Sequence, residues 1–261
     1  MGEEREFSTR WGKMKYSVSG NGCEYAVMLQ GWATVRALYG EISSAVEERY
    51  TVIAPALHGF GESDEPIEPM SVSDYASAVN DLLSYLKIKR AVFFCHSFGG
   101  RVFFKLNAME GRFTEPEKVI LCDVAGIVPR KSLLARARIG LFKAGKSFLS
   151  LPFMKKAFPS APEKLRSRSG SDDYRAASEM MKRVLVMAVN EDLRHLFPTI
   201  SCPALIMWGR QDTAVPLSDA YVIESSVADS AVIVFEESGH FPFLTEKPRF
   251  LAVVRSFFGI S

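Results

Sequence analysis

Short apolar runs alternate along the chain with longer stretches in which apolar residues recur every three or four positions. The short runs are rich in Val, Ile, Leu and Phe and lack polar alternation, which is typical of strands covered on both faces. They lie at Ala26–Gln30, Thr51–Ala56, Ala91–Cys95, Val119–Asp123, Ala204–Trp208 and Ala231–Phe235. This alternation predicts an α/β fold with a mostly parallel, doubly wound sheet and crossover helices.

The longer stretches between these runs predict helices. One of them opens on Ser71 and Asp74, a spacing typical of the capping box at a helix start. The predicted helices cover residues 71–86, Phe98–Met109, Ser218–Val227 and Lys247–Phe258. Near the start of the chain, Phe7–Arg10 and Lys13–Ser17 predict a hairpin that turns near Gly12.

The alternation of strands and helices stops between Val128 and Pro198, where only helical patterns occur. Residues 130–168 contain eleven Lys or Arg and a single acidic residue, Glu163, a local net charge of +10. Because the whole chain carries +2, the remainder sums to −8, and such an asymmetry marks a separate unit. We therefore predict an all-helical cap over residues 127–197, inserted between two parts of one core, 1–126 and 198–261.

Length and composition restrict the class of protein. The chain has 261 residues, 48% of them hydrophobic, which suits an α/β core with an insertion that needs no disulfide or metal for stability. Its four cysteines form no Cys-x-x-Cys pair, so we interpret them as free thiols. No apolar run approaches the ~18 residues of a membrane-spanning helix. The acidic N-terminus lacks a signal peptide's apolar stretch. We therefore predict a cytoplasmic protein without stable membrane insertion.

The strongest chemical signal is the segment Phe93-Phe-Cys-His-Ser97-Phe-Gly-Gly100, in which an apolar run ends and small residues follow a serine. Such a tight strand–turn–helix connection lifts the serine hydroxyl above the sheet edge as a nucleophile. The N–H of Phe98 would then point from a helix N-terminus toward a developing oxyanion. A serine between a strand and a helix is also a common N-cap, and this alternative stays open at the level of the sequence.

Two later loops carry a carboxylate and an imidazole. Asp212 follows the predicted strand that ends at Trp208, and His240 follows the last predicted strand. Because loops at the carboxyl ends of parallel strands converge on one crevice, we expect these groups to meet Ser97 there. The histidine can accept the serine proton, while the carboxylate fixes the histidine tautomer. Asp123, at the end of its own strand, is the alternative carboxylate.

The sequence resembles the serine-hydrolase branch of the α/β-hydrolase fold superfamily with an inserted helical cap. Besides the serine motif, the resemblance rests on segments that occur in the family's order and span most of the chain. They are Leu29-Gln-Gly-Trp32, His58-Gly-Phe-Gly-Glu-Ser63, Trp208-Gly-Arg-Gln-Asp212 and Gly239-His240-Phe-Pro-Phe-Leu-Thr-Glu-Lys-Pro248.

The resemblance implies a role for each matching residue. Ser97 would be the nucleophile, His240 the base and Asp212 the residue that orients the base. The backbone N–H groups of Trp32 and Phe98 would form the oxyanion hole. No cofactor is implied, and because no two histidines have metal-ligand spacing, no metal site is predicted.

The sequence departs from the family pattern at three positions. Cys95 replaces the glycine two residues before the nucleophile, Gln30 replaces the histidine of the usual His-Gly pair, and Ala56 replaces a common aspartate. We expect a hydrogen bond from Gln30 to hold the loop that contains Trp32, which we call the oxyanion loop. Together with His96 and Phe241, Gln30 is also a candidate for the lining of the substrate pocket.

These residues predict a two-step acyl transfer on a small-molecule substrate. The aromatic residues near the motifs favour a small, apolar carboxylic ester or lactone. Two alternatives stay open: a hydrolase that cleaves a carbon–carbon bond flanked by ketones, and a hydrolase-like receptor that binds a small molecule with little turnover.

The basic segment allows several interpretations. The simplest is a cap that buries its apolar side and leaves its charges in solvent. It could also steer anionic substrates toward the site or dock transiently on anionic membranes. Its basic and aromatic residues form no recognisable nucleic-acid-binding module, so we predict no nucleic-acid partner. The sequence does not indicate an oligomeric state.

Overall fold

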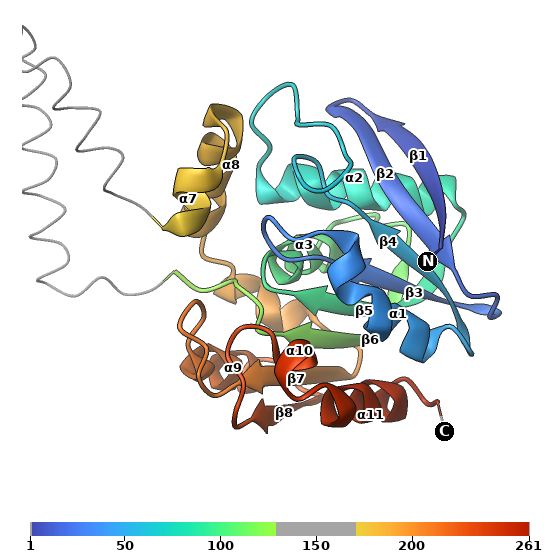
Figure 1. The fold of residues 1–261 in the computed structure, drawn as a ribbon, viewed down its shortest axis with the longest axis vertical. Coiled ribbons are helices and arrows are strands. Elements are labelled where there is room, and N and C mark those ends of the chain that lie inside the picture. Colours follow the sequence, from blue (N-terminus) through green and yellow to red (C-terminus); the bar gives the residue numbers. More distant parts are fainter. Residues whose placement is uncertain (1, 129–170, 261) are drawn as a thin grey trace, which may run out of the picture.

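A computed structural model describes residues 2–128 and 171–260 of the chain and contains one eight-stranded sheet (Figure 1). The strands are β1 (Glu3–Thr9), β2 (Gly12–Ser19), β3 (Glu24–Leu29), β4 (Tyr50–Pro55), β5 (Arg90–His96), β6 (Glu115–Cys122), β7 (Ala204–Gly209) and β8 (Ser230–Phe235). Their order across the sheet is β1-β2-β4-β3-β5-β6-β7-β8. Strands β1 and β2 pair antiparallel, β2 also pairs antiparallel with β4, and all the other pairs are parallel.

Helices cover both faces of the sheet (Figure 1). The α-helices are α1 (Gly40–Val46), α2 (Val72–Tyr85), α3 (Phe98–Asn107), α7 (Asp172–Ala176), α8 (Glu179–Asn190), α9 (Leu217–Glu224), α10 (Pro242–Thr245) and α11 (Lys247–Phe257). Two 3-10 helices, η1 (Arg36–Tyr39) and η2 (Arg194–Thr199), complete the described elements.

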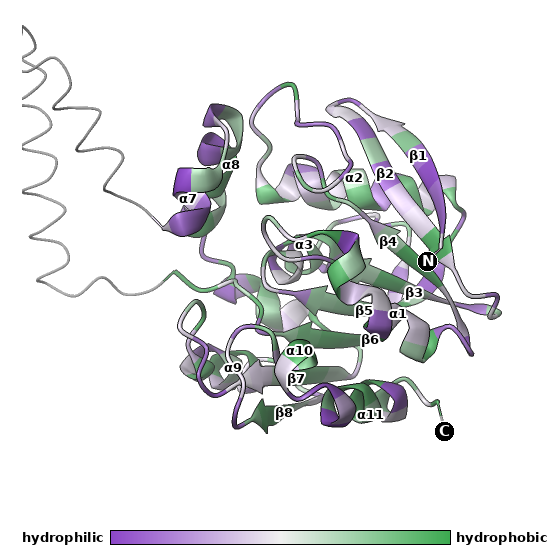
Figure 2. Cartoon of the chain, in the orientation of Figure 1, coloured by the Kyte–Doolittle hydropathy of each residue, from purple (hydrophilic) through white to green (hydrophobic). Residues whose placement is uncertain are grey.

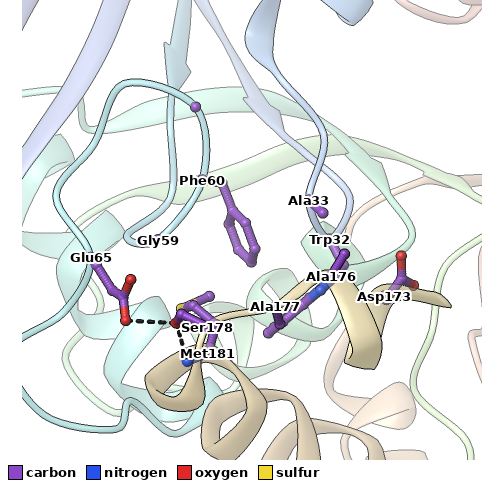
Figure 3. Close-up of a pocket in the computed structure, with 11 residues that line it drawn as sticks. Trp32, Ala33, Gly59, Phe60, Glu65, Asp173, Ala176, Ala177, Ser178 and Met181 are labelled. Carbon is purple, nitrogen blue, oxygen red and sulfur yellow. Dashed lines mark hydrogen bonds between the residues drawn. The ribbon is translucent and has the colours of Figure 1, made fainter. Parts of the chain in front are cut away.

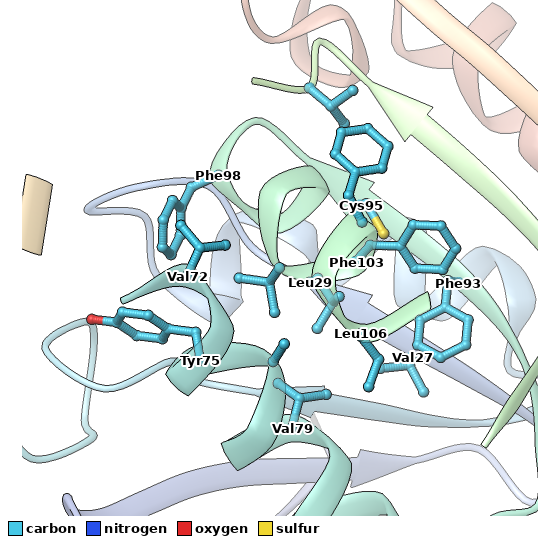
Figure 4. Close-up of a cluster of buried hydrophobic side chains, with 14 of the residues drawn as sticks. Val27, Leu29, Val72, Tyr75, Val79, Phe93, Cys95, Phe98, Phe103 and Leu106 are labelled. Atoms are coloured by element: carbon cyan, nitrogen blue, oxygen red, sulfur yellow. The ribbon is translucent and has the colours of Figure 1, made fainter. Parts of the chain in front are cut away.

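The side chains of the parallel strands alternate between two apolar layers. In β5, Phe93 and Cys95 belong to the apolar layer that also contains residues of α2, α3, α8 and α9, whereas Val92 and Phe94 belong to the layer that contains residues of α1 and α11. Figure 4 shows the first layer, where the side chains of α2 and α3 meet those of β3 and β5. The middle strands are therefore apolar on both faces, in contrast to the more polar β1 and β2 (Figure 2).

The predicted fold class is confirmed, and the predicted strands and hairpin overlap the observed ones. The main departure in the sheet is β6, which begins at Glu115, before the predicted Val119. The helix pair η1 and α1, between β3 and β4, was not predicted. Its buried residues are only Tyr39, Ile42 and Val46, so its apolar pattern is short.

The inserted segment leaves and re-enters the core at one place. The N–H of Leu193 donates to the carbonyl of Gly126 at 2.8 Å, and the N–H of Val128 donates to a carboxylate oxygen of Asp192 at 3.3 Å. The described part of the predicted cap, from residue 171 onward, is helical. The basic segment, residues 130–168, lies outside the described residues. In the described part of the chain, no helix is long and apolar enough to cross a bilayer.

Candidate active site

Ser97 lies between the end of β5 and the first residue of α3, in a strained conformation with φ 49° and ψ −111°. Neighbouring backbone groups hold this turn, because the N–H of Ser97 donates to the carbonyl of Cys122 while its own carbonyl accepts from Gly100 and Ala125. The Ser97 side chain makes no capping hydrogen bond to α3. Ser97 therefore occupies the N-cap position of α3, but its hydroxyl is not used to stabilise the helix.

The two glycines after Ser97 allow α3 to start directly against the sheet. A Cβ atom at Gly99 would lie 2.1 Å from the carbonyl oxygen of Leu29, and one at Gly100 would lie 2.3 Å from Cβ of Val124. Small residues are thus required here because backbone and side chains approach closely, as the sequence motif indicates. Cys95 is accommodated because its side chain is completely buried in the apolar layer beneath the turn.

Asp212 and His240 meet as predicted. Nδ1 of His240 and Oδ2 of Asp212 lie 2.7 Å apart, and the other oxygen of Asp212 accepts from the N–H groups of Ala214 and Val215. Burial alone would raise the pKa of Asp212, but the hydrogen bond and charge of His240 and these two N–H groups outweigh it, so the pKa is lowered. The carboxylate is therefore held in its charged form beside the imidazole.

The nucleophile motif and the His240 loop are in direct contact. Nε2 of His96, the residue before Ser97, lies 2.8 Å from the carbonyl oxygen of His240, and the centroids of the two imidazole rings are 4.8 Å apart. The described hydrogen bonds do not include one between the Ser97 hydroxyl and the His240 ring. The loops after β5, β7 and β8 thus bring Ser97, Asp212 and His240 to the same edge of the sheet.

The loop after β3 lies against Ser97. A Cβ atom at Gly31 would lie 3.3 Å from Cβ of Ser97, and the Trp32 ring packs edge-on against Phe98 with centroids 5.4 Å apart. Within residues 2–128 and 171–260, no hydrogen bond occupies the backbone N–H of Trp32 or Phe98. Both groups are free to donate to an oxyanion.

Asp123 lies directly behind the Asp212–His240 pair. It is completely buried, its oxygens accept from the N–H of Gly209 at 2.9 Å and from Sγ of Cys122 at 3.3 Å, and no hydrogen bond joins it to His240. Burial raises its pKa; the N–H of Gly209 opposes this shift and the charge of Asp212 adds to it, so the pKa lies well above its usual range. The carboxylate that contacts His240 is therefore Asp212.

These two carboxyls and His240 are the group in the described residues whose spacing, within 4.8 Å, would suit a cation. Within this group, Nδ1 of His240 is hydrogen-bonded to Asp212.

Comparison with known proteins agrees with this geometry. A family model described as the alpha/beta hydrolase family matches residues 26–254. The chain belongs to the α/β-hydrolase family. This confirms the predicted superfamily and enzyme class, a hydrolase.

Several relatives of this α/β hydrolase are named for an activity. A pimeloyl-[acyl-carrier protein] methyl ester esterase of Aliivibrio fischeri is 25% identical over 93% of this chain and 96% of its own length. The solved structure of an esterase from Exiguobacterium antarcticum is 26% identical, with a TM-score of 0.74 over 98% of this chain and 99% of that one. An enol-lactonase from Burkholderia xenovorans, 19% identical over 98% of this chain and 100% of its own, has a TM-score of 0.74 and shares the fold.

A cavity of about 280 Å³ adjoins the oxyanion loop of the hydrolase (Figure 3). Its apolar lining includes Trp32, Phe60 and Met181, and Met181 comes from helix α8 of the predicted cap. The hydroxyl of Ser178 donates to Oε1 of Glu65 at 2.7 Å and so joins the start of α8 to the core loop that contains Phe60. The cavity therefore lies between the core and the described part of the cap.

Gln30, His96 and Phe241, the residues predicted to line the substrate pocket, do not line this cavity. Gln30 and His96 are buried at 2% and 0% exposure. Gln30 instead donates from Nε2 to the carbonyl of Thr34 at 2.5 Å and holds the oxyanion loop, as expected. Phe241 packs edge-on against the His240 ring. These residues support the site from behind.

Sequence reasoning missed the cavity residues Phe60 and Met181, and also Tyr39, whose hydroxyl contacts His96. Phe60 lies within the His58-Gly-Phe-Gly segment, so that motif could have indicated it. Met181 and Tyr39 lie in helices that carry no sequence signal for a site.

Proposed function

We propose that this protein is a serine esterase that hydrolyses small, uncharged, apolar carboxylic esters or lactones. The observation that carries the proposal is the 2.7 Å contact between His240 and Asp212 at the sheet edge where Ser97 occupies a strained turn. Nucleophilic acyl transfer needs a histidine that a carboxylate orients and a serine whose hydroxyl is not used in a capping hydrogen bond.

In the first step, Nε2 of His240 accepts the hydroxyl proton as Oγ of Ser97 attacks the ester carbonyl. The negative charge that develops on the carbonyl oxygen is stabilised by the N–H groups of Trp32 and Phe98. The tetrahedral intermediate collapses, the C–O bond of the ester breaks, and the imidazolium returns its proton to the departing alcohol. The acyl group stays on Ser97.

In the second step, His240 accepts a proton from water, whose oxygen attacks the acyl carbon. The intermediate breaks the bond to Oγ of Ser97, which takes back the proton from His240, and the carboxylic acid leaves. Asp212 keeps its negative charge throughout and stabilises the imidazolium in both steps.

The cavity supports the choice of substrate. Trp32, Phe60 and Met181 favour an apolar acyl or alcohol group, and the carboxylates of Glu65 and Asp173 lie at the same cavity. Negative charge there disfavours an anionic substrate, so we prefer an uncharged ester to the anionic substrate that the basic segment suggests. The esterase names of the relatives from Aliivibrio fischeri and Exiguobacterium antarcticum support the same reaction class.

The test compares two serines that begin helices. Ser97→Ala is expected to abolish hydrolysis of p-nitrophenyl esters and labelling by a fluorophosphonate probe, without loss of stability. Ser71 caps α2 with a side-chain hydrogen bond, so Ser71→Ala is expected to cost about 1 kcal/mol of stability and keep full activity. Full activity of Ser97→Ala would refute the proposal.

A panel of substrates then separates the related activities. Esters of increasing acyl length and lactones are expected to be hydrolysed, and activity should fall once the acyl group exceeds the cavity. If the protein cleaves carbon–carbon bonds flanked by ketones and hydrolyses no ester, it is a carbon–carbon bond hydrolase instead. If the protein binds esters but neither hydrolyses them nor reacts with the probe, it is a receptor.

A further inference from the structure

A continuous chain of buried hydrogen bonds links the oxyanion loop to the loop that carries His240. The N–H of Gly31 donates to the hydroxyl of Tyr39 at 2.8 Å, and this hydroxyl lies 2.9 Å from Oγ1 of Thr34 and 3.0 Å from Nδ1 of His96. Nε2 of His96 lies 2.8 Å from the carbonyl oxygen of His240. Two segments about two hundred residues apart in sequence are thus joined through two side chains.

The surroundings of this chain are apolar and closed to solvent. Tyr39 is 3% exposed and His96 is completely buried, and both rings pack against Phe243. A Cβ atom at Gly31 would lie only 2.7 Å from Nδ1 of His96, so a residue with a side chain would collide with the imidazole at this position. In such a setting each hydrogen bond is strong, and a lost partner cannot be replaced by water.

The carbonyl of His240 fixes which ring nitrogen of His96 carries the proton. This carbonyl can only accept, so Nε2 of His96 must carry the proton and Nδ1 must be the acceptor. Tyr39 therefore donates its hydroxyl proton to Nδ1 and accepts from the N–H of Gly31, while the hydroxyl of Thr34 donates to the carbonyl of Gly31 at 2.8 Å. This assignment requires a neutral His96, and complete burial, followed by the charge of His240, lowers the pKa of His96 to about 3.

We infer that Tyr39 and His96 are positioning residues, which hold the His240 imidazole and the oxyanion loop in fixed relation through this hydrogen-bond chain. The inference rests on the proposed esterase reaction, in which His240 and the N–H of Trp32 act on the same substrate carbonyl. Both groups lie on loops, and small displacements of either would lower the rate without preventing substrate binding. Because Tyr39 and His96 are both buried, we assign them a positioning role rather than contact with the substrate.

The first experiment compares two buried tyrosines. Tyr39→Phe is expected to lower kcat for a p-nitrophenyl ester about tenfold, with KM changed less than about twofold. Tyr50 is the matched control, because its buried hydroxyl donates to the carbonyl of Phe258 at the opposite end of the strands. Tyr50→Phe removes an equivalent hydrogen bond and should leave kcat unchanged.

The second experiment varies His96. Glutamine can still donate to the carbonyl of His240, whereas leucine cannot, so His96→Gln should retain most of the activity that His96→Leu loses. Combining Tyr39→Phe with His96→Leu should lower kcat no further than His96→Leu alone, because both changes break the same chain.

A measurement independent of turnover completes the test. The proton between Nδ1 of His240 and Asp212 can be followed by NMR and assigned by its absence in His240→Gln. Its exchange with water should be about tenfold faster in Tyr39→Phe than in Tyr50→Phe. Equal exchange and equal kcat in these two variants would overturn the inference. If the wild type hydrolyses no ester, the proposed function fails, and the exchange rates alone still decide whether the chain positions His240.

Discussion

Ser97 has a backbone conformation that costs a residue with a side chain about 1–3 kcal/mol. Its hydroxyl does not compensate for this strain, because it makes no capping hydrogen bond. We expect Ser97→Gly to raise the free energy of unfolding by about 1 kcal/mol over the wild type and to abolish ester hydrolysis. Urea denaturation of both proteins tests this, and an unchanged or lower stability would contradict it.

Two neighbouring carboxyls differ in what they contribute to the site. Asp212→Asn removes the negative charge bonded to His240, so kcat should fall by about 10⁴-fold. Asp123→Asn replaces a carboxyl whose pKa is already raised, and kcat should fall less than about tenfold. Steady-state kinetics of the two variants distinguish them, and the reverse order would make Asp123 the orienting residue.

The burial of His96 makes stability depend on pH. Its pKa is lowered from 6.5 to about 3, so between these values the unfolded chain binds a proton that the native protein does not. Stability is therefore lost as pH falls from about 6.5 toward 3, by up to about 1.4 kcal/mol per pH unit from this group. Urea denaturation between pH 4 and 7 should show a shallower dependence for His96→Gln, and identical slopes would refute this.

Single residues were predictable where a motif specifies their chemistry. Ser97, Asp212 and His240 each follow a strand in a recognisable segment, and the structure brings them to one edge of the sheet. The position of Tyr39 depends instead on which elements pack together. No local pattern distinguishes a tyrosine hydroxyl that meets an imidazole from one that meets a carbonyl.

At the level of the elements, strands were easier to predict than short helices. Strands β4, β5 and β7 are buried on both faces, so their sequences are almost continuously apolar. Helix α1 contains Glu41, Ser43 and Ser44 among its seven residues and buries only Ile42 and Val46. Its stability comes from packing against the sheet and α11 rather than from its own amphipathic pattern.

The contact between α3 and β3 predicts opposite effects for two glycines. In Gly99→Ala the new methyl would meet the carbonyl of Leu29, and we expect a loss of several kcal/mol or insoluble protein. Gly40, at the start of α1, has helical angles and no heavy atom within 4 Å of a Cβ, so Gly40→Ala should stabilise by about 0.5 kcal/mol. Thermal unfolding measures both, and a tolerated Gly99→Ala would contradict the close approach.

At the level of the whole molecule, charge patterning predicted the inserted segment, but the cavity was beyond sequence reasoning. Trp32, Phe60 and Met181 come from separate loops and a helix, and only the assembled fold brings them together. The predicted division into residues 1–126, 127–197 and 198–261 stays a prediction, as does the role of the basic segment.

Ser178 joins the two walls of the cavity. It caps α8 through the N–H of Met181 and donates to Glu65, so Ser178→Ala should loosen this wall. We expect KM for an apolar ester to rise about threefold while kcat changes little, because the reacting groups lie elsewhere. Ser77→Ala, on the exposed side of α2, is the control. Equal KM values for the two variants would show that the wall does not depend on Ser178.

The pairing of β6 with β7 joins the chain on either side of the inserted segment, from Val119 opposite Ala204 to Cys122 opposite Met207. Ser97 belongs to the half before this seam, and Asp212 and His240 belong to the half after it. Neither half alone holds a complete set of reacting groups. Ester hydrolysis by a mixture of separately produced halves would therefore show that they had reassembled along this seam. The two halves could then serve as a split reporter, in which activity signals that they have come together.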